Sequence, residues 1–248
     1  MKNEITNYKK DGFVRLVGFM DEKEIINLEN SLNDLTQLFE SNIKKYKSRF
    51  CNFTSNGKVN TLHSLEKYKF VEKILNSEKF IKLAKNFLSE EPKQFGSEYF
   101  AKPAHTGIAV PPHQDNYYWC LNNPNIITIW IAISKVTIEN GAIYYYKGSQ
   151  KKGIIPHIGS NTPGSSQYIP DIINHFDNKL KTFVELNRGD VLIHHSLVVH
   201  GSGPNKSVFP RKGFTIRYSS NDQSVNKEMQ AKYEQSLKEQ LLERGDTF

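Results

Sequence analysis

The sequence predicts a mainly β protein, an antiparallel sandwich or barrel with helices packed on its outside. After Pro92 the chain consists of short β-like runs separated by Pro, Gly and Asn. Helical spacing of apolar residues is found mainly before Pro92. A length of 248 residues with 38% hydrophobic residues is sufficient for one large core. We therefore expect a single domain over 1–248, with a mostly helical part at 1–92, a β core at 93–220 and a C-terminal helix within 221–248.

The first part of the chain alternates between one strand signal and several helix signals. Residues 12–17 (GFVRLV) predict a short strand, and Asp21 with Glu24 forms a capping-box pattern that begins a helix. Further helices are expected at 64–75 and from Ser77. The first helix has a buried stripe, formed by Ile25, Leu28, Leu32, Leu35 and Phe39.

The second part contains the strands of the predicted β core. Apolar residues occupy both faces of 126–134, which indicates a central strand. Residues 159–168 are small and polar, so we expect a mobile loop there and consider it a candidate lid. The charged segment 225–244 is expected to be a terminal helix. The other strand runs are QFGSEYFA, AIYYY, TFVEL, VLIHH and GFTIRYSS.

Composition narrows the possible partners. The net charge is +7 and the pI about 9.2, but the lysines are scattered, which argues against nucleic acid and leaves a small anionic substrate possible. Cys51 and Cys120 have no paired spacing and are expected to be reduced thiols. The start of the chain has no apolar signal segment, and no run reaches the roughly 20 apolar residues of a membrane span. We expect a cytoplasmic protein with a small-molecule substrate and no membrane partner.

The stretch PPHQDNYYW, residues 111–119, suggests a metal site. In a strand His113 and Asp115 point to the same face and can share one ion. Among the eight histidines, His200 is the best third ligand, because it follows a strand and precedes a Gly-rich turn. Two imidazoles and one carboxylate leave positions open on the ion, as non-haem Fe(II) oxygenases require. A chance pattern on a surface strand remains the alternative.

The other histidines are weaker candidates. His194 and His195 are adjacent and must face opposite ways on a strand. We expect His63 and His175 to be surface or capping residues.

Four segments carry a family resemblance in the order they occur: DGFVRLVGFMDEKEIINLENSL, KPAHTGIAVPPHQDNYYW, ENGAIYYYKGSQKKG and HGSGPNKSVFPRKGFTIRY. With these segments the sequence resembles the phytanoyl-CoA dioxygenase (PhyH) family of Fe(II)- and 2-oxoglutarate-dependent oxygenases, which also includes ectoine hydroxylases. The resemblance covers most of the chain. Gln150 departs from the family pattern, which has a histidine after Gly-Ser, and this departure concerns the lip of the site rather than a metal ligand.

The resemblance implies a double-stranded β-helix, that is, a cupin-like jelly roll, with the N-terminal helices packed outside. It also implies three cofactors or cosubstrates: Fe(II), 2-oxoglutarate and O₂. The implied iron ligands and catalytic residues are His113, Asp115 and His200. Arg211 would hold the distal carboxylate of 2-oxoglutarate in two parallel hydrogen bonds. Ser202 would donate a hydroxyl to the same carboxylate, and Trp130 would line the cosubstrate pocket or simply pack in the core.

The residues expected to bind the primary substrate lie around these motifs. Tyr117 and Trp119 follow the ligand segment and are expected to border the substrate, with Asn116 hydrogen-bonding beside them. Lys102 would attract an anionic group, with a surface lysine as the alternative. Arg217 shares a strand face with Arg211 and either faces the pocket or pairs with an acidic neighbour.

The implied function is a dioxygenase that hydroxylates a small polar or anionic metabolite, with release of succinate and CO₂. The main alternative is a non-catalytic jelly roll that binds a small ligand or a metal. Nucleic-acid demethylation is suggested only by the positive charge. A halogenase is disfavoured, because Asp115 occupies the position that such relatives leave open to halide.

Overall fold

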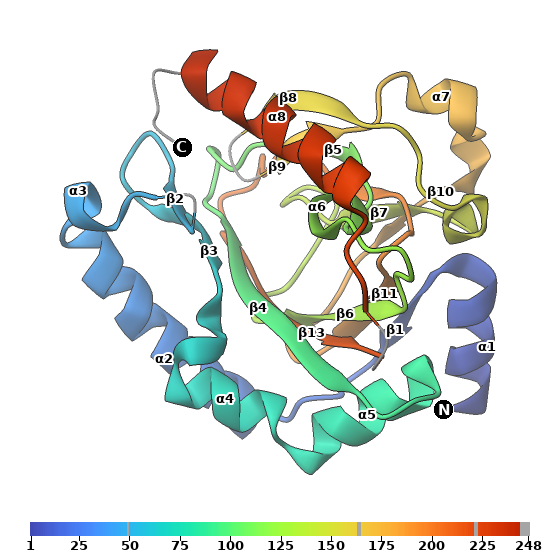
Figure 1. Cartoon of the computed structure of the whole chain (residues 1–248). Helices are drawn as coiled ribbons and strands as arrows, with labels where there is room; N and C mark the ends of the chain where they lie inside the picture. Colours follow the sequence, from blue (N-terminus) through green and yellow to red (C-terminus); the bar gives the residue numbers. More distant parts are fainter. Residues whose placement is uncertain (49, 163–164, 221–222, 244–248) are drawn as a thin grey trace.

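Two antiparallel sheets form the centre of the fold (Figure 1). The computed structural model describes residues 1–48, 50–162, 165–220 and 223–243. In these residues the large sheet has the strand order β1-β11-β6-β13-β4-β3-β2, and the small sheet has the order β10-β7-β12-β5. Strands β8 and β9 form a separate hairpin. This arrangement is a jelly roll, which confirms the predicted fold class.

The strands of the large sheet are β1 (Phe13–Leu16), β2 (Cys51–Phe53), β3 (Val59–His63), β4 (Lys93–Lys102), β6 (Ile126–Ala132), β11 (Val191–His195) and β13 (Arg211–Ser219). The remaining strands are β5 (Val110–His113), β7 (Ile143–Tyr146), β8 (Ile158–Thr162), β9 (Ser165–Tyr168), β10 (Lys181–Val184) and β12 (His200–Ser202).

The α-helices are α1 (Lys2–Asp11), α2 (Glu22–Glu40), α3 (Ile43–Tyr46), α4 (Lys69–Leu75), α5 (Glu78–Leu88), α6 (Asn116–Trp119), α7 (Ile172–His175) and α8 (Lys227–Glu243). Short 3₁₀ turns are η1 (Leu65–Lys67), η2 (Ser149–Lys152) and η3 (Asn178–Leu180). Figure 1 shows α1, α2, α4 and α5 outside the large sheet, and α8 next to β8.

The central strand β6 explains how the large sheet separates a helix-packed side from an inner side. Every residue of β6 is buried, as predicted, and β11 and β13 pair with it on either side. Ile127, Ile129 and Ile131 belong to the core shared with the outer helices, whereas Trp130 packs in the core between the sheets. The period of two along β6 therefore directs Thr128 and Trp130 toward the interior of the jelly roll.

Helix α2 begins as the sequence predicts. Asp21 accepts a hydrogen bond from the Glu24 amide at 2.8 Å, and Glu24 accepts one from the Asp21 amide at 2.9 Å. This reciprocal pair satisfies two backbone donors at the helix end. The stripe of Ile25, Leu28 and Leu32 then packs on the large sheet.

Several elements differ from the sequence prediction. Strands β2 and β3 come from the part expected to be mostly helical, and α1 was not expected because only Tyr8 is buried in it. The segment 159–168, expected to be a loop, lies largely in the β8–β9 hairpin, and its residues 163–164 lie outside the described residues. Small polar residues do not exclude pairing when a neighbour covers one face, here α8. Within the part of the chain that is described, none of the helices combines the length and apolarity required to span a bilayer.

Candidate metal centre and its cavity

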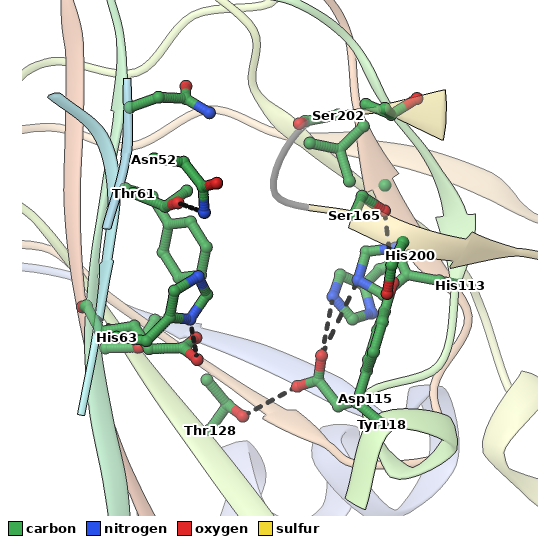
Figure 2. Close-up of a pocket in the computed structure, with 18 of the residues that line it drawn as sticks. Asn52, Thr61, His63, His113, Asp115, Tyr118, Thr128, Ser165, His200 and Ser202 are labelled. Carbon is green, nitrogen blue, oxygen red and sulfur yellow. Dashed lines mark hydrogen bonds and ion pairs between the residues drawn. The ribbon is translucent and has the colours of Figure 1, made fainter. Parts of the chain in front are cut away.

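A cavity of about 660 Å³ lies between the two sheets. Its walls include residues of both sheets, of α6 and of α8. Figure 2 shows His113, Asp115 and His200 on one side of this cavity, with His63 and Thr61 across from them. The cavity therefore has two sides with different chemistry, and each is built from different strands.

The three predicted metal ligands come together on the first side. His113 ends β5 and His200 begins β12, and these two residues are direct cross-strand partners. Asp115 is the N-cap residue of α6, just after the end of β5. One ligand atom from each residue lies within 4.8 Å of the others. The Nε2 atoms of His113 and His200 lie 3.8 and 3.6 Å from Asp115 Oδ1.

Backbone carbonyls fix the orientation of both imidazoles. Nδ1 of His113 donates to the Pro111 carbonyl at 2.9 Å, and Nδ1 of His200 donates to the Val198 carbonyl at 3.0 Å. A neutral imidazole with its proton on Nδ1 has a free lone pair on Nε2. Both lone pairs therefore face Asp115, which is the arrangement that metal-binding histidines need.

Burial also sets the protonation of the triad. Desolvation lowers the pKa of both His113 and His200 to about 4, so both rings are neutral at pH 7. Burial alone would raise the pKa of Asp115, but His200, His194 and Arg217 outweigh it and hold this pKa below its usual range. Two neutral imidazoles and one carboxylate anion are thus ready to bind a cation without releasing a proton.

A second group of residues holds Asp115, and the sequence prediction missed it. Thr128 donates to Asp115 Oδ2 at 3.0 Å, and His194 Nε2 donates to the same oxygen at 3.2 Å. Tyr145 in turn donates to His194 Nδ1 at 2.9 Å. Oδ2 is therefore occupied, whereas Oδ1 faces His113 and His200. The available signal was the alternation along β11, which turns His194 inward and His195 toward Tyr8.

The predicted cosubstrate residues also line the cavity. Arg211 is only 4% exposed, its guanidinium lies 5.4 Å from the Trp130 ring centroid, and its Nε has no hydrogen-bond partner among the described residues. Desolvation lowers its pKa to about 10, which still leaves the side chain charged at pH 7. Ser202 is buried and lines the same cavity. A Cβ on Gly213 would meet Trp130 at 1.8 Å, so this glycine makes room for the indole.

The predicted substrate residues divide into two groups. Lys102, Trp119 and Arg217 line the cavity, but Asn116 and Tyr117 do not. Asn116 instead exchanges hydrogen bonds with the Leu121 backbone.

The prediction for Tyr117 failed because of the local shape of residues 116–119. Tyr117 stacks on His157, because residues 116–119 form a helical turn that points successive side chains in different directions. Tyr118, which was not predicted, lines the cavity in its place.

Lys102 is neither a surface lysine nor a free cation. Its ammonium donates to the carbonyls of Ile108 and Gly203 at 2.5 and 2.7 Å. Burial, with Arg211 nearby, lowers its pKa to about 6. The amine is thus held by the backbone beside Arg211.

The sequence left two alternatives for Arg217, facing the pocket or pairing with an acidic neighbour. The structure has both, because Arg217 lines the cavity and pairs with Glu98. Its guanidinium hydrogen-bonds Glu98 and lies 5.2 Å from the Trp119 ring centroid. Glu98 also accepts a hydrogen bond from His63 Nδ1 at 2.7 Å. His63 was expected to be a surface or capping residue, yet it lines the cavity, because β3 pairs with β4 and places His63 opposite Glu98.

Gln150 lies away from this cavity. Its side-chain amide donates to the Lys9 carbonyl at 3.3 Å, at the end of α1. The prediction that Gln150 concerns the lip of the site is therefore wrong, because its side chain binds the end of α1.

Comparisons with known proteins agree with this geometry. The family model described as phytanoyl-CoA dioxygenase (PhyH) matches residues 8–213. A probable alpha-ketoglutarate-dependent hypophosphite dioxygenase of Stutzerimonas stutzeri is 30% identical over 156 residues, which cover 61% of this chain and 54% of that protein. The chain thus spans about half the length of the curated relatives it matches.

Solved structures show the same fold. EvdO2 from Micromonospora carbonacea var. aurantiaca, complexed with 2-oxoglutarate, matches with a TM-score of 0.70 at 20% identity, covering 91% of this chain and 92% of that one. EctD from S. alaskensis in its apoform matches with a TM-score of 0.73 at 14% identity, covering 89% and 77%. Since the family model covers most of the sequence, the chain belongs to the phytanoyl-CoA dioxygenase family, as its motifs predict.

Proposed function

We propose that this protein is an Fe(II)- and 2-oxoglutarate-dependent dioxygenase that hydroxylates a small polar or anionic metabolite and releases succinate and CO₂. One observation carries the proposal. A buried triad of two neutral imidazoles and a carboxylate shares a cavity with Arg211, which has no ion-pair partner among the described residues. A metal-binding protein without turnover has no use for that arginine.

The donor set of the triad fits Fe(II). Nitrogen and oxygen donors suit this ion, and neither Cys51 nor Cys120 lines the cavity to favour a thiolate-bound metal. When bound, Fe(II) and 2-oxoglutarate supply the oxygen-activating chemistry. His113, Asp115 and His200 would hold the ion, and Thr128 and His194 would keep Asp115 Oδ1 turned toward it.

The unpaired arginine fits the cosubstrate. Arg211 would bind the distal carboxylate of 2-oxoglutarate, because a buried guanidinium gains most from a bidentate anion. Ser202 would add a hydroxyl donor, and Trp130 would hold the guanidinium plane in place. Burial of these side chains excludes water and strengthens each charged hydrogen bond.

The test separates the dioxygenase from a binding protein. Purified protein is titrated anaerobically with Fe(II) and then with 2-oxoglutarate, and the visible absorption band of the chelated cosubstrate is recorded. Air and ascorbate are then admitted, and succinate is measured. We expect the band and slow succinate release in wild type, and neither in His200→Ala. Binding without any succinate, with every class of metabolite added, would overturn the proposal.

A further inference from the structure

The second side of the cavity contains its own charged group, the Glu98 cluster, which we define as His63, Glu98 and Arg217. Glu98 accepts hydrogen bonds from both neighbours. Burial alone would raise the pKa of Glu98, but Arg217 and His63 outweigh it and lower this pKa to about 2. The proposed function uses none of these three side chains, although all of them line the cavity.

The charges that face the cavity are almost all compensated. Among the described lining residues the lysine and arginine side chains are Lys102, Arg211 and Arg217, and the carboxylates are Glu98, Asp115 and Glu234. Two backbone carbonyls hold the amine of Lys102, and Glu98 neutralises Arg217. Arg211 is the one unpaired guanidinium in this described lining, and the proposed function assigns it to 2-oxoglutarate. An anionic substrate would therefore find no unpaired arginine or lysine there.

The same side is well supplied with neutral hydrogen-bonding groups. Because ionised Glu98 can only accept, His63 Nδ1 donates the hydrogen bond between them, and His63 Nε2 is left for another partner. No described residue donates to that Nε2. Asn52 donates to Thr61 at 3.0 Å, which leaves the amide oxygen of Asn52 as an acceptor on the same side of the cavity as His63 (Figure 2). Trp119 adds an aromatic surface.

We propose that the primary substrate enters this side with an uncharged hydroxyl- or amide-bearing group, and that His63 Nε2 forms a hydrogen bond with it. Glu98 sets this preference by neutralising Arg217, so it is a specificity-determining residue that acts through Arg217. The inference rests on the proposed function and narrows it, since it removes substrates that carry their negative charge at this end.

The two tryptophans of the chain, Trp119 and Trp130, both line the cavity, which makes a direct test possible. In Trp130→Phe all tryptophan emission comes from Trp119, next to Arg217. Iodide, a negatively charged quencher, accumulates near an unpaired cation, whereas neutral acrylamide reports access alone. The ratio of the two quenching constants is measured on metal-free protein at low salt and at about pH 8, above the ordinary histidine pKa.

The expected ratio in Trp130→Phe is no higher than that of free N-acetyltryptophanamide. Adding Glu98→Gln should raise the ratio about twofold or more, because Arg217 loses its counter-charge. Adding Arg217→Gln to that variant should return the ratio to its starting value. A ratio well above the free indole with Glu98 intact, reduced by Arg217→Gln alone, would overturn the proposal. This comparison does not depend on Glu98→Gln folding.

A second measurement tests the hydrogen bond. Metabolites in matched neutral, carboxylated and phosphorylated forms are screened for stimulation of 2-oxoglutarate consumption and for a shift in Trp119 emission. Neutral members should act, and His63→Phe should abolish their emission shift while 2-oxoglutarate binding persists. Stimulation only by anionic members, dependent on Arg217 and indifferent to His63, would refute the inference. Failure of the iron titration would instead contradict the proposed function and leave the quenching ratio interpretable.

Discussion

Two arginines on one strand, Arg211 and Arg217 of β13, face the same cavity and each lies over a tryptophan ring, but they differ in their acidic partners. Arg211 has no acidic partner among the described residues, and burial lowers its pKa to about 10. Burial alone would also lower the pKa of Arg217, but Glu98 and Asp115 outweigh it and raise this pKa. Of the two arginines, Glu98 on the neighbouring strand β4 pairs with Arg217 only. Arg211 can therefore still bind an anion.

The largest effect should follow from removing the proposed metal ligands on the first side of the cavity. His113→Ala, Asp115→Ala and His200→Ala each remove one ligand while the sheet cores persist, so we expect turnover to be abolished. Metal affinity should fall by more than the tenfold to hundredfold typical of supporting residues. Metal content and circular dichroism of each variant check this. Retained metal and activity in His200→Ala would shift the assignment to His194.

Removing the acidic partner should destabilise the fold. Glu98→Gln leaves Arg217 buried at 8% exposure without its ion-pair partner, and breaking a buried ion pair costs about 3–5 kcal/mol of unfolding free energy. Chemical denaturation of wild type and variant measures the difference. A change below about 1 kcal/mol would mean that water or another group already compensates Arg217.

The difference in unfolding free energy between wild type and Glu98→Gln should also depend on pH, in a direction that the pKa of Glu98 sets. Since the pKa of Glu98 is lowered from 4.5 to about 2 in the folded state, its stabilisation is fully present above about pH 5. It is lost as the pH falls through about 2, and amounts to about 3 kcal/mol. The difference in unfolding free energy between wild type and Glu98→Gln should therefore shrink on acidification. A difference that grows toward low pH would contradict the assignment.

Crowding Trp130, on which Arg211 packs, should have a smaller effect on stability. Gly213→Ala places a Cβ against Trp130 and should cost about 1–3 kcal/mol of stability through overpacking. Displacement of Trp130 should also weaken 2-oxoglutarate binding through Arg211, which packs on it. Thermal unfolding and cosubstrate titration measure the two effects. The matched control is Gly203→Ala, where a Cβ would meet nothing within 4 Å.

The smallest effects are expected from substitutions that keep the positive charge of Arg211 or of Arg217. Arg211→Lys loses the two-pronged geometry and should raise the KM for 2-oxoglutarate about tenfold, or about 1.4 kcal/mol if KM follows affinity. Arg217→Lys should leave this KM nearly unchanged. The reverse ranking would show that the two arginines have exchanged roles.

The sequence predicted well what depends on local pattern. Apolar residues on both faces located β6, and the run GFTIRYSS located most of β13. His113 and Asp115 lie together as predicted, but not on one strand, because β5 ends at His113 and Asp115 is the N-cap of α6. The sequence could not show that His63 faces Glu98, because that contact depends on the register between two strands separated by two helices. Asn116 and Tyr117 were misplaced for the opposite reason, since a single helical turn is too short to leave a periodic signal.

Helix α8 has a consequence for how such enzymes diversify. It contributes Tyr233, Glu234 and Leu237 to the cavity, yet it lies beyond residues 8–213, which the family model matches. The candidate metal ligands and Arg211 all fall inside that range. Replacing this one helix would change part of the cavity wall while the candidate metal ligands and Arg211 stay the same. Exchanging α8 for the corresponding segment of a relative is therefore a way to change substrate specificity without altering the metal ligands or Arg211.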